Sequence, residues 1–321
     1  MNRKRTAAVT ITAIITIVVL AVLFYAIHVR DEAVRRLFLK SKMIAVEERG
    51  LKFRREVGYR VVTAKWVMET WGEIPQSEIE KYRILGEVYR LLGIIPWETD
   101  LVSIVEGQRG AAMAAAVGDD VYIVREYFHP ESEAYTVEIL VHELTHILQR
   151  QNLPSYSPEW YDETLAWYSL IEGDALITAY SAAVRHYNYR PFRVSLGYPE
   201  NYSDPLRMLW LFPYAYGDDF IQNLYRLGGW NLVNRCYSNP PVTTEQILYP
   251  ERYLAGESYV GVDTPLIPGF TVKYTDRMGM FFLNVYVGVN AGTEYVNVSS
   301  AWQGDNLTLQ ERNGSSLQSG P

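Results

Sequence analysis

The sequence predicts an α+β fold, in which a mostly helical domain with a small antiparallel sheet follows an N-terminal transmembrane helix. Three observations lead to this class. Residues 6–27 form an uncharged apolar stretch, residues 57–61 and 110–126 show strand patterns, and helical periodicity dominates after Pro130. Of the 321 residues, 48% are apolar and 21% are charged, which is typical of a chain that packs a core.

Residues 6–27 are the predicted membrane anchor. These 22 residues carry no charge and are long enough to span the hydrocarbon layer as a helix. The alternative is a secretory signal peptide, but the apolar run is longer than a signal core and no small-residue cleavage pattern precedes His28. We therefore expect a cytoplasmic tip and an uncleaved signal-anchor over residues 1–29, with the lipid bilayer as a partner.

The orientation of the anchor is predicted from charge and from glycosylation sequons. A basic cluster, Arg3-Lys4-Arg5, favours a cytoplasmic N-terminus, although basic residues also follow the span closely. Four Asn-x-Ser/Thr sequons are compatible with a body outside the cell. They occur at Asn201, Asn297, Asn306 and Asn313. We expect a single-pass protein of the cell membrane with an extracytoplasmic body.

Mixed elements are expected between the anchor and Pro130. Residues 30–50 combine charged side chains with spaced apolar ones and predict a juxtamembrane helix. The alternation over residues 57–61 predicts a strand, after which Thr63 can cap a short helix. A second helix is predicted over residues 77–92, before a glycine and a proline.

A hairpin and then a run of helices complete the predicted fold. Residues 110–126 contain a strand of small residues, a turn at Gly118-Asp119-Asp120, and an apolar strand. Helices are expected near residues 133–152, 158–187, 205–228 and 229–238. The Gly/Ser-rich end, residues 313–321, predicts a flexible tail.

Charge and cysteine content exclude several classes of protein. The formal charge is −7, and without the basic cluster at the N-terminus 27 basic residues face 37 acidic ones. A body near −10 is poorly suited to bind a phosphate backbone, so no nucleic-acid partner is expected. The single cysteine, Cys236, excludes an internal disulfide framework and a thiolate-based zinc cluster.

The pattern His-Glu-x-x-His occurs inside a predicted apolar helix. His142 and His146 are four residues apart, so their rings project from the same side of the helix and can converge on one ion. Glu143 follows the first histidine and points about a quarter-turn away, where it can reach a metal-bound water without ligating the metal. This is the motif of zinc sites in which the glutamate is the general base. Only five histidines occur in the chain, which makes a chance match improbable.

The third ligand is expected to be a carboxylate on the next helix. Glu163 and Glu172 are nine residues apart, about two and a half turns, so they face opposite ways. Glu172 shares its face with apolar residues, where only neutralisation by a metal makes a carboxylate tolerable. We therefore expect Glu172 to be the ligand and Glu163 and Asp174 to lie on a solvated face. A supporting role for Asp162 stays open. Gly173 indicates close approach of another backbone.

These motifs resemble those of the gluzincin metallopeptidases, particularly a membrane-linked or secreted prokaryotic group. The likeness includes His142-Glu143-Leu144-Thr145-His146 and Glu172-Gly173-Asp174-Ala175. It continues in Gly228-Gly229-Trp230, in residues 240–250 and in Trp302-Gln303-Gly304-Asp305. Relatives commonly carry histidine where this chain has Tyr249. Because the likeness extends over about residues 50–312, it implies one zinc metallopeptidase domain at 51–312 with a zincin-like fold.

The resemblance implies one Zn²⁺ held by His142, His146 and Glu172, with Glu143 as the general base. It also implies that residues 110–117 form an edge strand that pairs with an extended substrate; packing of these small residues against the active-site helix is the alternative. An oxyanion donor is also needed, and His186, Tyr214 and Tyr216 are the candidates. Of these we select Tyr216.

The predicted function is membrane-anchored hydrolysis of peptide bonds in a peptide or protein substrate. The alternative is a membrane-anchored, zinc-stabilised binding or scaffold protein without turnover. Glu143 distinguishes the two, because a scaffold needs the metal ligands but has no use for a base between them.

Overall fold

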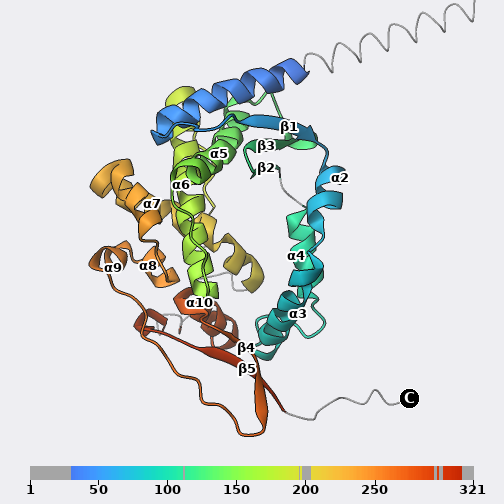
Figure 1. Ribbon diagram of the computed structural model, residues 1–321, viewed down its shortest axis with the longest axis vertical. Coiled ribbons are helices and arrows are strands. Elements are labelled where there is room, and N and C mark those ends of the chain that lie inside the picture. Colours follow the sequence, from blue (N-terminus) through green and yellow to red (C-terminus); the bar gives the residue numbers. More distant parts are fainter. Residues whose placement is uncertain are drawn as a thin grey trace, which may run out of the picture.

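The computed structural model describes residues 30–110, 113–194, 196, 204–292, 295 and 299–312. Residues 30–49 form a helix that lies across one end of the molecule (Figure 1). Its buried face carries Val34, Leu37 and Phe38, which share a hydrophobic cluster with residues far along the chain, such as Leu140. The predicted juxtamembrane helix is therefore present, and it packs on the body of the protein.

The first sheet lies under this helix and has three strands. They are β1 (Gly58–Val62), β2 (Ala114–Val117) and β3 (Asp120–Val124). The order is β1-β3-β2, with β2 antiparallel and β1 parallel to β3. The predicted hairpin is confirmed, but the sheet is mixed and not antiparallel throughout. A parallel pair is feasible because a long crossover separates β1 from β3.

That crossover consists of short helices. They are α2 (Ala64–Val67), the π-helical turn η1 (Met68–Gly72), α3 (Gln76–Leu91) and α4 (Leu101–Arg109). The Thr63 side chain accepts a hydrogen bond from the Trp66 N–H, which confirms the predicted cap of the first helix. Helix α4 was not predicted from the sequence, although Asp100 caps it in the same way.

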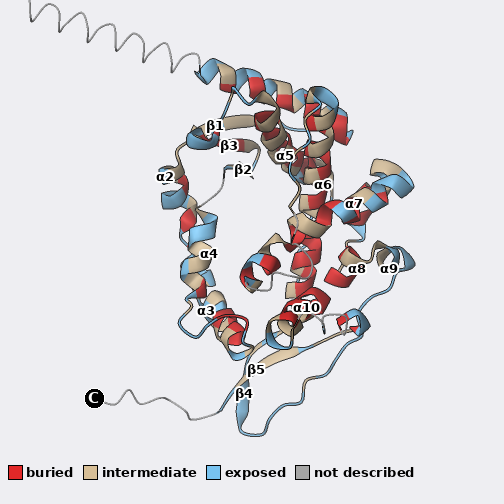
Figure 2. Ribbon diagram, turned by 180° about the vertical axis from the view of Figure 1, so that it is seen from behind, coloured by how far each residue is buried: buried red, intermediate tan, exposed pale blue. Residues whose placement is uncertain are grey.

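Three long helices form the other half of the molecule. They are α5 (Glu133–Asn152), α6 (Tyr161–Tyr187) and α7 (Pro205–Ser238), and a 3₁₀ turn, η2 (Arg125–Tyr127), precedes them. Helix α6 is buried along most of its length (Figure 2). The last of the three is interrupted at Gly228 and Gly229, whose backbone angles are not helical, where the sequence predicts two helices.

The C-terminal part adds a second sheet that the sequence analysis did not predict. The elements of this C-terminal part are α8 (Thr244–Leu248), α9 (Pro250–Ala255), β4 (Phe270–Asp276), α10 (Gly279–Asn290) and β5 (Leu307–Arg312), of which β4 and β5 form the sheet. The two strands pair antiparallel to each other and lie at the opposite end from the first sheet (Figure 1). Most side chains of β4 are exposed, so the strand lacks the alternation by which a half-buried strand is recognised.

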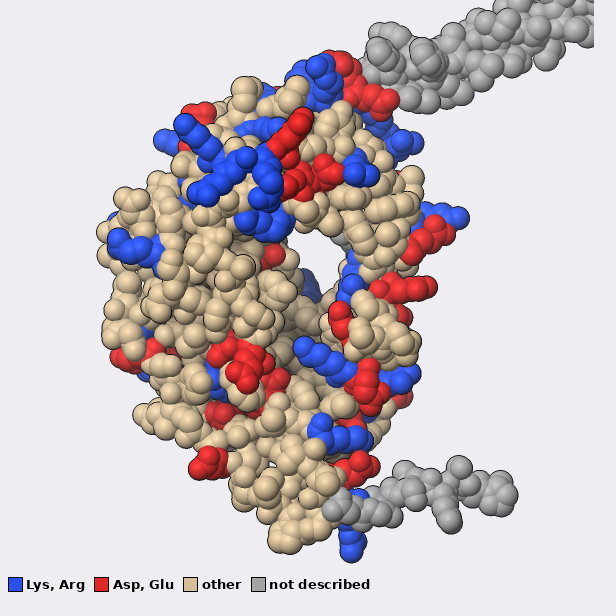
Figure 3. All heavy atoms as spheres, viewed as in Figure 1, with Lys and Arg blue, Asp and Glu red and all other residues tan. Residues whose placement is uncertain are grey.

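The elements enclose a hollow between two sides of the molecule. Helices α2, α3 and α4 form one side, and α5, α6 and α7 form the other (Figure 1). The space-filling view shows this hollow as an opening between them (Figure 3). Two hydrophobic clusters support this arrangement, one around α6, α7 and α10 and one around α5 and the first sheet.

Among the described residues, no helix is both long and apolar enough to cross a membrane. The predicted anchor, residues 6–27, lies outside the described residues, as does the predicted tail at 313–321.

Candidate metal centre

The structure brings His142, His146 and Glu172 together. The two histidines lie on consecutive turns of α5 and the glutamate on α6, which packs beside it. The Nε2 atoms of His142 and His146 are 3.1 Å apart. The Oε2 atom of Glu172 lies 3.2 Å from the first of these nitrogens and 3.5 Å from the second. Three potential ligand atoms thus form a nearly equilateral triangle.

This triangle is largely removed from solvent, and its charges are strongly coupled. Burial raises the pKa of Glu172, but the imidazoles of His146 and His142 outweigh that effect and hold the pKa well below its ordinary value. Burial likewise lowers the pKa of His146, yet the Glu172 carboxylate raises it to about 9. The carboxylate is therefore ionised and His146 protonated at neutral pH, so the two form an ion pair in which a bound cation would take the place of the imidazole proton.

Gln149 orients one of the histidines. Its Nε2 donates to the Ile171 carbonyl at 2.9 Å, and this leaves its Oε1 facing His146 Nδ1 at 3.0 Å. Because that oxygen only accepts, His146 donates from Nδ1, and Nε2 is the nitrogen that faces Glu172 and that could bind a metal after losing its proton. The sequence analysis missed Gln149, although it lies three residues after the second histidine of the motif, one helical turn away.

Glu143 and a tyrosine of α7 lie close to the triangle. The Glu143 carboxylate raises the pKa of both His146 and Tyr214, so it is close to both side chains. Burial is the largest effect that raises the pKa of Tyr214, followed by Glu172, to which its hydroxyl donates a hydrogen bond. This hydroxyl therefore stays protonated at neutral pH. Tyr216, selected from the sequence, packs its ring against Phe212 and Phe281.

The position of Tyr214 follows from the crossing of α6 and α7. A Cβ atom added to Gly173 would lie 2.1 Å from the Gly217 carbonyl oxygen, and one added to Gly217 would lie 2.3 Å from the Ser169 carbonyl oxygen. The two helices therefore touch through their backbones, which confirms the close approach predicted at Gly173. Gly173 follows Glu172 directly, and Tyr214 lies three residues, about one helical turn, before Gly217. The contact of the two glycines therefore brings Tyr214 to the site.

The other carboxylates of α6 are not on a solvated face, and that prediction is wrong. Asp174 is fully buried and accepts from Arg49 Nε at 2.6 Å and from the Tyr237 hydroxyl at 2.7 Å. Glu163 is 7% exposed and accepts from Arg277 Nη2 at 2.9 Å. Arginines supplied by distant segments neutralise both groups, and such partners are not visible in the pattern of α6.

Asp162 holds the C-terminal part of the chain in place. Its Oδ1 accepts from the Thr244 N–H at 2.8 Å and from the Thr244 hydroxyl at 2.7 Å. Asp305 accepts from the N–H groups of Met278 and Gly279 at 2.7 and 2.8 Å. Two of the motifs quoted for the resemblance therefore have structural contacts. Residues 240–250 bond to the start of α6, and residues 302–305 bond to the start of α10.

His186 lies outside the triangle. Its Nε2 faces Glu48 Oε1 at 3.0 Å, and Arg185 pairs with the second oxygen of that carboxylate at 3.1 Å. Glu47, Glu48 and His186 form another cluster of potential ligand atoms within 4.8 Å of one another. Because Arg185 and His186 already pair with the buried Glu48 carboxylate, this cluster is an ion-pair network.

Strand β2 is one of the two edge strands of the first sheet, as the resemblance implies, since the strand order leaves it with only β3 as a neighbour. It also contacts α5, the helix that carries the histidines. Both readings of residues 110–117, a substrate-pairing edge and a packing surface, are therefore compatible with its place. Residues 111 and 112 lie outside the described part of the chain.

Comparisons with known proteins match parts of this architecture. A family model described as the eCIS core domain matches residues 95–154, a segment that contains His142 and His146 but not Glu172. The search of curated proteins finds no match. A presumed hydrolase with a novel fold from Chloroflexus aurantiacus is a similar solved structure, with 14% sequence identity, a TM-score of 0.43, and coverage of 71% of this chain and 89% of that chain. The gluzincin resemblance stays a prediction from the motifs.

Proposed function

We propose that this protein is a membrane-anchored zinc metallopeptidase whose metal is held by His142, His146 and Glu172. The separations of their three atoms carry the proposal. Ligands about 2.0–2.1 Å from a tetrahedral zinc ion lie roughly 3.3 Å from one another. The observed separations are 3.1, 3.2 and 3.5 Å. The side chains therefore have the spacing of three corners of a zinc tetrahedron.

The chemistry of the donors supports the same metal. Two imidazoles and one carboxylate, with a fourth position open, form a common ligand set of catalytic zinc. The Oε2 atom of Glu172 is buried and accepts no hydrogen bond of good geometry within the described part of the chain. A buried oxygen without a partner is costly, and a cation between it and the two imidazoles removes that cost.

Three side chains supply the steps of peptide hydrolysis. When bound, zinc polarises the substrate carbonyl and makes water more acidic. Glu143 accepts the proton of the attacking water and delivers it to the leaving amine. The protonated Tyr214 hydroxyl donates a hydrogen bond to the carbonyl oxygen as charge develops on it, the role that the sequence analysis gave to Tyr216. Gln149 keeps His146 in the tautomer that ligates through Nε2.

Glu143 separates the peptidase from the zinc-stabilised scaffold. It is only partly buried, and its carboxylate lies near the triangle without contributing one of its three ligand atoms. A scaffold gains nothing from a second carboxylate beside the ligands, because Glu172 already supplies the carboxylate that holds the metal. The base is therefore explained by turnover and not by metal retention.

The test compares wild type with Glu143→Gln on a quenched peptide library after loading with zinc. We expect wild type to cleave, and the variant to retain zinc while losing about 10²- to 10⁴-fold in rate. Glu126→Gln is a matched control, because Glu126 lies on the surface outside the triangle. Equal zinc content with no cleavage by either protein would contradict the peptidase and favour the scaffold.

The membrane anchor is part of the proposal and rests on the sequence of residues 6–27. The described helix at 30–49 follows this stretch along the chain, and its exposed face carries Arg35 and Arg36. We expect the full chain to fractionate with membranes and to be protected from a protease added on the cytoplasmic side. Release of the full chain by alkaline carbonate would contradict a spanning segment.

A further inference from the structure

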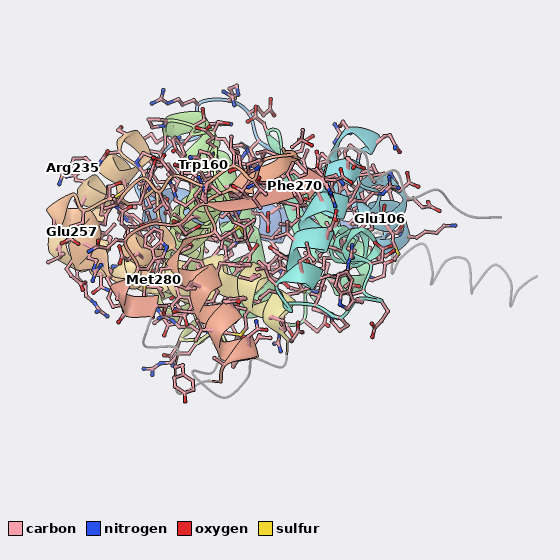
Figure 4. The ribbon with its side chains drawn as sticks, turned by 90° about the horizontal axis from the view of Figure 1, so that it is seen from below. Glu106, Trp160, Arg235, Glu257, Phe270 and Met280 are labelled. Atoms are coloured by element: carbon pink, nitrogen blue, oxygen red, sulfur yellow. The ribbon has the colours of Figure 1, made fainter. Side chains whose placement is uncertain are left out.

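A cleft of about 610 Å³ extends from the candidate metal centre along α6. Glu172 and Tyr214 line one end of it, and Tyr161 and Asp276 line the other. Its walls come from α3 and α4 on one side and from α6 and α7 on the other, so it belongs to the hollow between the two sides of the molecule (Figure 3). Seen from the β4–β5 end, Trp160 lies in the middle of that end, beside the strand that starts at Phe270 (Figure 4).

Aromatic side chains from several elements line the cleft. Tyr82 comes from α3, Trp160 precedes α6, Tyr168 lies within it, and Trp210 comes from α7. Tyr168 is 48% exposed, which is unusual for a large ring in the wall of a concave site. Aromatic surface left open inside a cleft is the surface that binds apolar groups.

Tyr168 connects the aromatic lining to the metal end. It is one helical turn before Glu172, so both side chains project from the same face of α6. Tyr82 lines the same cleft from α3, on the opposite wall. We refer to these two rings, one from each wall, as the Tyr82–Tyr168 pair.

The polar groups of the lining favour a peptide over an acyl chain. Lys81, Gln108, Arg109 and Glu159 are distributed along the walls, so both signs of charge are present. Such a lining suits the polar backbone of a peptide, whereas an acyl chain needs apolar walls throughout. From residue 161 to Glu172 the cleft follows α6 for about 16 Å, the span of roughly five extended residues.

We propose that this cleft binds an extended peptide on one side of the scissile bond and that the Tyr82–Tyr168 pair selects an aromatic or large aliphatic side chain next to that bond. The inference rests on the proposed function, because it takes Glu172 as the catalytic end of the cleft. At the far end the polar groups bond to each other, since Asp276 accepts from the Tyr161 N–H at 2.7 Å.

The test uses zinc-loaded protein and hexapeptides of Gly and Ala that carry Gly, Ala, Leu, Phe or Asp at one position beside the cleaved bond. We expect wild type to prefer Phe and Leu over Ala by on the order of 30-fold in kcat/KM. Tyr168→Ala should lose most of this preference, through a lower kcat/KM on the Phe and Leu peptides, and its zinc content should be unchanged.

The matched control is Tyr225→Ala. Tyr225 is 43% exposed, lies on α7, and packs against Trp230 outside the cleft. We expect this variant to keep the preference of wild type. No preference in wild type, or a preference that survives both Tyr168→Ala and Tyr82→Ala, would overturn the assignment of the cleft.

A binding experiment separates failure of the cleft from failure of the peptidase. Glu143→Gln, loaded with zinc, is titrated with the same peptides carrying a fluorophore. Tighter binding of the Phe peptide that Tyr168→Ala abolishes supports the cleft, even if wild type cleaves nothing and the peptidase fails. Equal binding of all peptides, or displacement of the Phe peptide by a lower concentration of a fatty acid, overturns it.

Discussion

Helix α6 carries carboxylates at two kinds of site, which differ in the groups that contact the carboxylate. At Asp162, Glu163 and Asp174 the partners are hydroxyls, backbone N–H groups and arginines from distant segments. At Glu172 the partners are two imidazoles and the Tyr214 hydroxyl, with one buried oxygen left without a hydrogen bond. Arginine is always charged, so it neutralises a carboxylate at every physiological pH and has no lone pair to offer a metal. A neutral imidazole, in contrast, has a lone pair that can bind a cation.

The difference indicates which carboxylates support the fold and which one is available for chemistry. Asp174 is only two residues from Glu172, yet Arg49 and Tyr237 satisfy it from the opposite side of the helix. Removing a partner of Asp162, Glu163 or Asp174 should therefore lower the free energy of unfolding, whereas removing the Glu172 side chain should lower the affinity for a metal.

The largest effect is expected for Arg49→Met. Both side chains of the Arg49–Asp174 pair are fully buried, so the substitution leaves an uncompensated charge. Breaking a pair of this kind lowers the free energy of unfolding by roughly 3–5 kcal/mol. Urea denaturation of the zinc-free protein measures it. The double variant Arg49→Met, Asp174→Asn is the control and should recover part of the loss; a change below about 1 kcal/mol in the single variant would show that the pair is dispensable.

Glu172→Ala should leave the fold intact and lower zinc affinity by more than about 100-fold, because one of three ligands is removed. Chelator competition measures the affinity and circular dichroism the fold. Glu163→Ala is the matched control on the same helix, since it should destabilise the protein through Arg277 and leave zinc affinity within about threefold. The opposite pattern would mean that Glu163 is the ligand.

Gln149→Ala tests whether the orientation of the His146 imidazole affects metal binding at the triangle of His142, His146 and Glu172. Without the Oε1 acceptor, His146 is free to adopt the wrong tautomer, and zinc affinity should fall by about 10- to 100-fold. The same titration serves here. Gln151→Ala is a control of equal size on α5, because Gln151 bonds Asp119 and the N–H groups of Arg54 and Arg55, away from the triangle. Equal affinity in both variants would remove Gln149 from the site.

The smallest effect is expected for a carboxylate paired at the surface. Lys40, Arg36 and Tyr187 lower the pKa of Glu133 to about 2, with the Lys40 hydrogen bond as the main cause. Its stabilising contribution is present above pH 4.5 and is lost as the pH falls toward 2. Between pH 4.5 and 2, Glu133→Gln should therefore lose less stability than wild type, and the difference should be below about 1 kcal/mol. Thermal unfolding at several pH values measures this difference. A steeper loss in the variant would contradict this sign.

The catalytic motif could be predicted from the sequence because its geometry is local. His142, Glu143 and His146 are separated by fixed helical spacing, and the apolar surroundings of Glu172 indicated the face of α6 that meets the two histidines. The partners of Asp174 and Glu163 could not be predicted, because Arg49 and Arg277 lie more than 100 positions away along the chain. Tyr214 was among the sequence candidates, but only the contact of Gly173 with Gly217 places it at the site.

Zinc content per chain after dialysis against metal-free buffer tests the central claim most directly. Wild type and Glu143→Gln should each retain about one zinc ion, because Glu143 is proposed as the base and not as a ligand, while His146→Ala and Glu172→Ala should retain almost none. Zinc retained at full stoichiometry by Glu172→Ala, or no zinc bound by wild type after loading, would contradict the proposed centre.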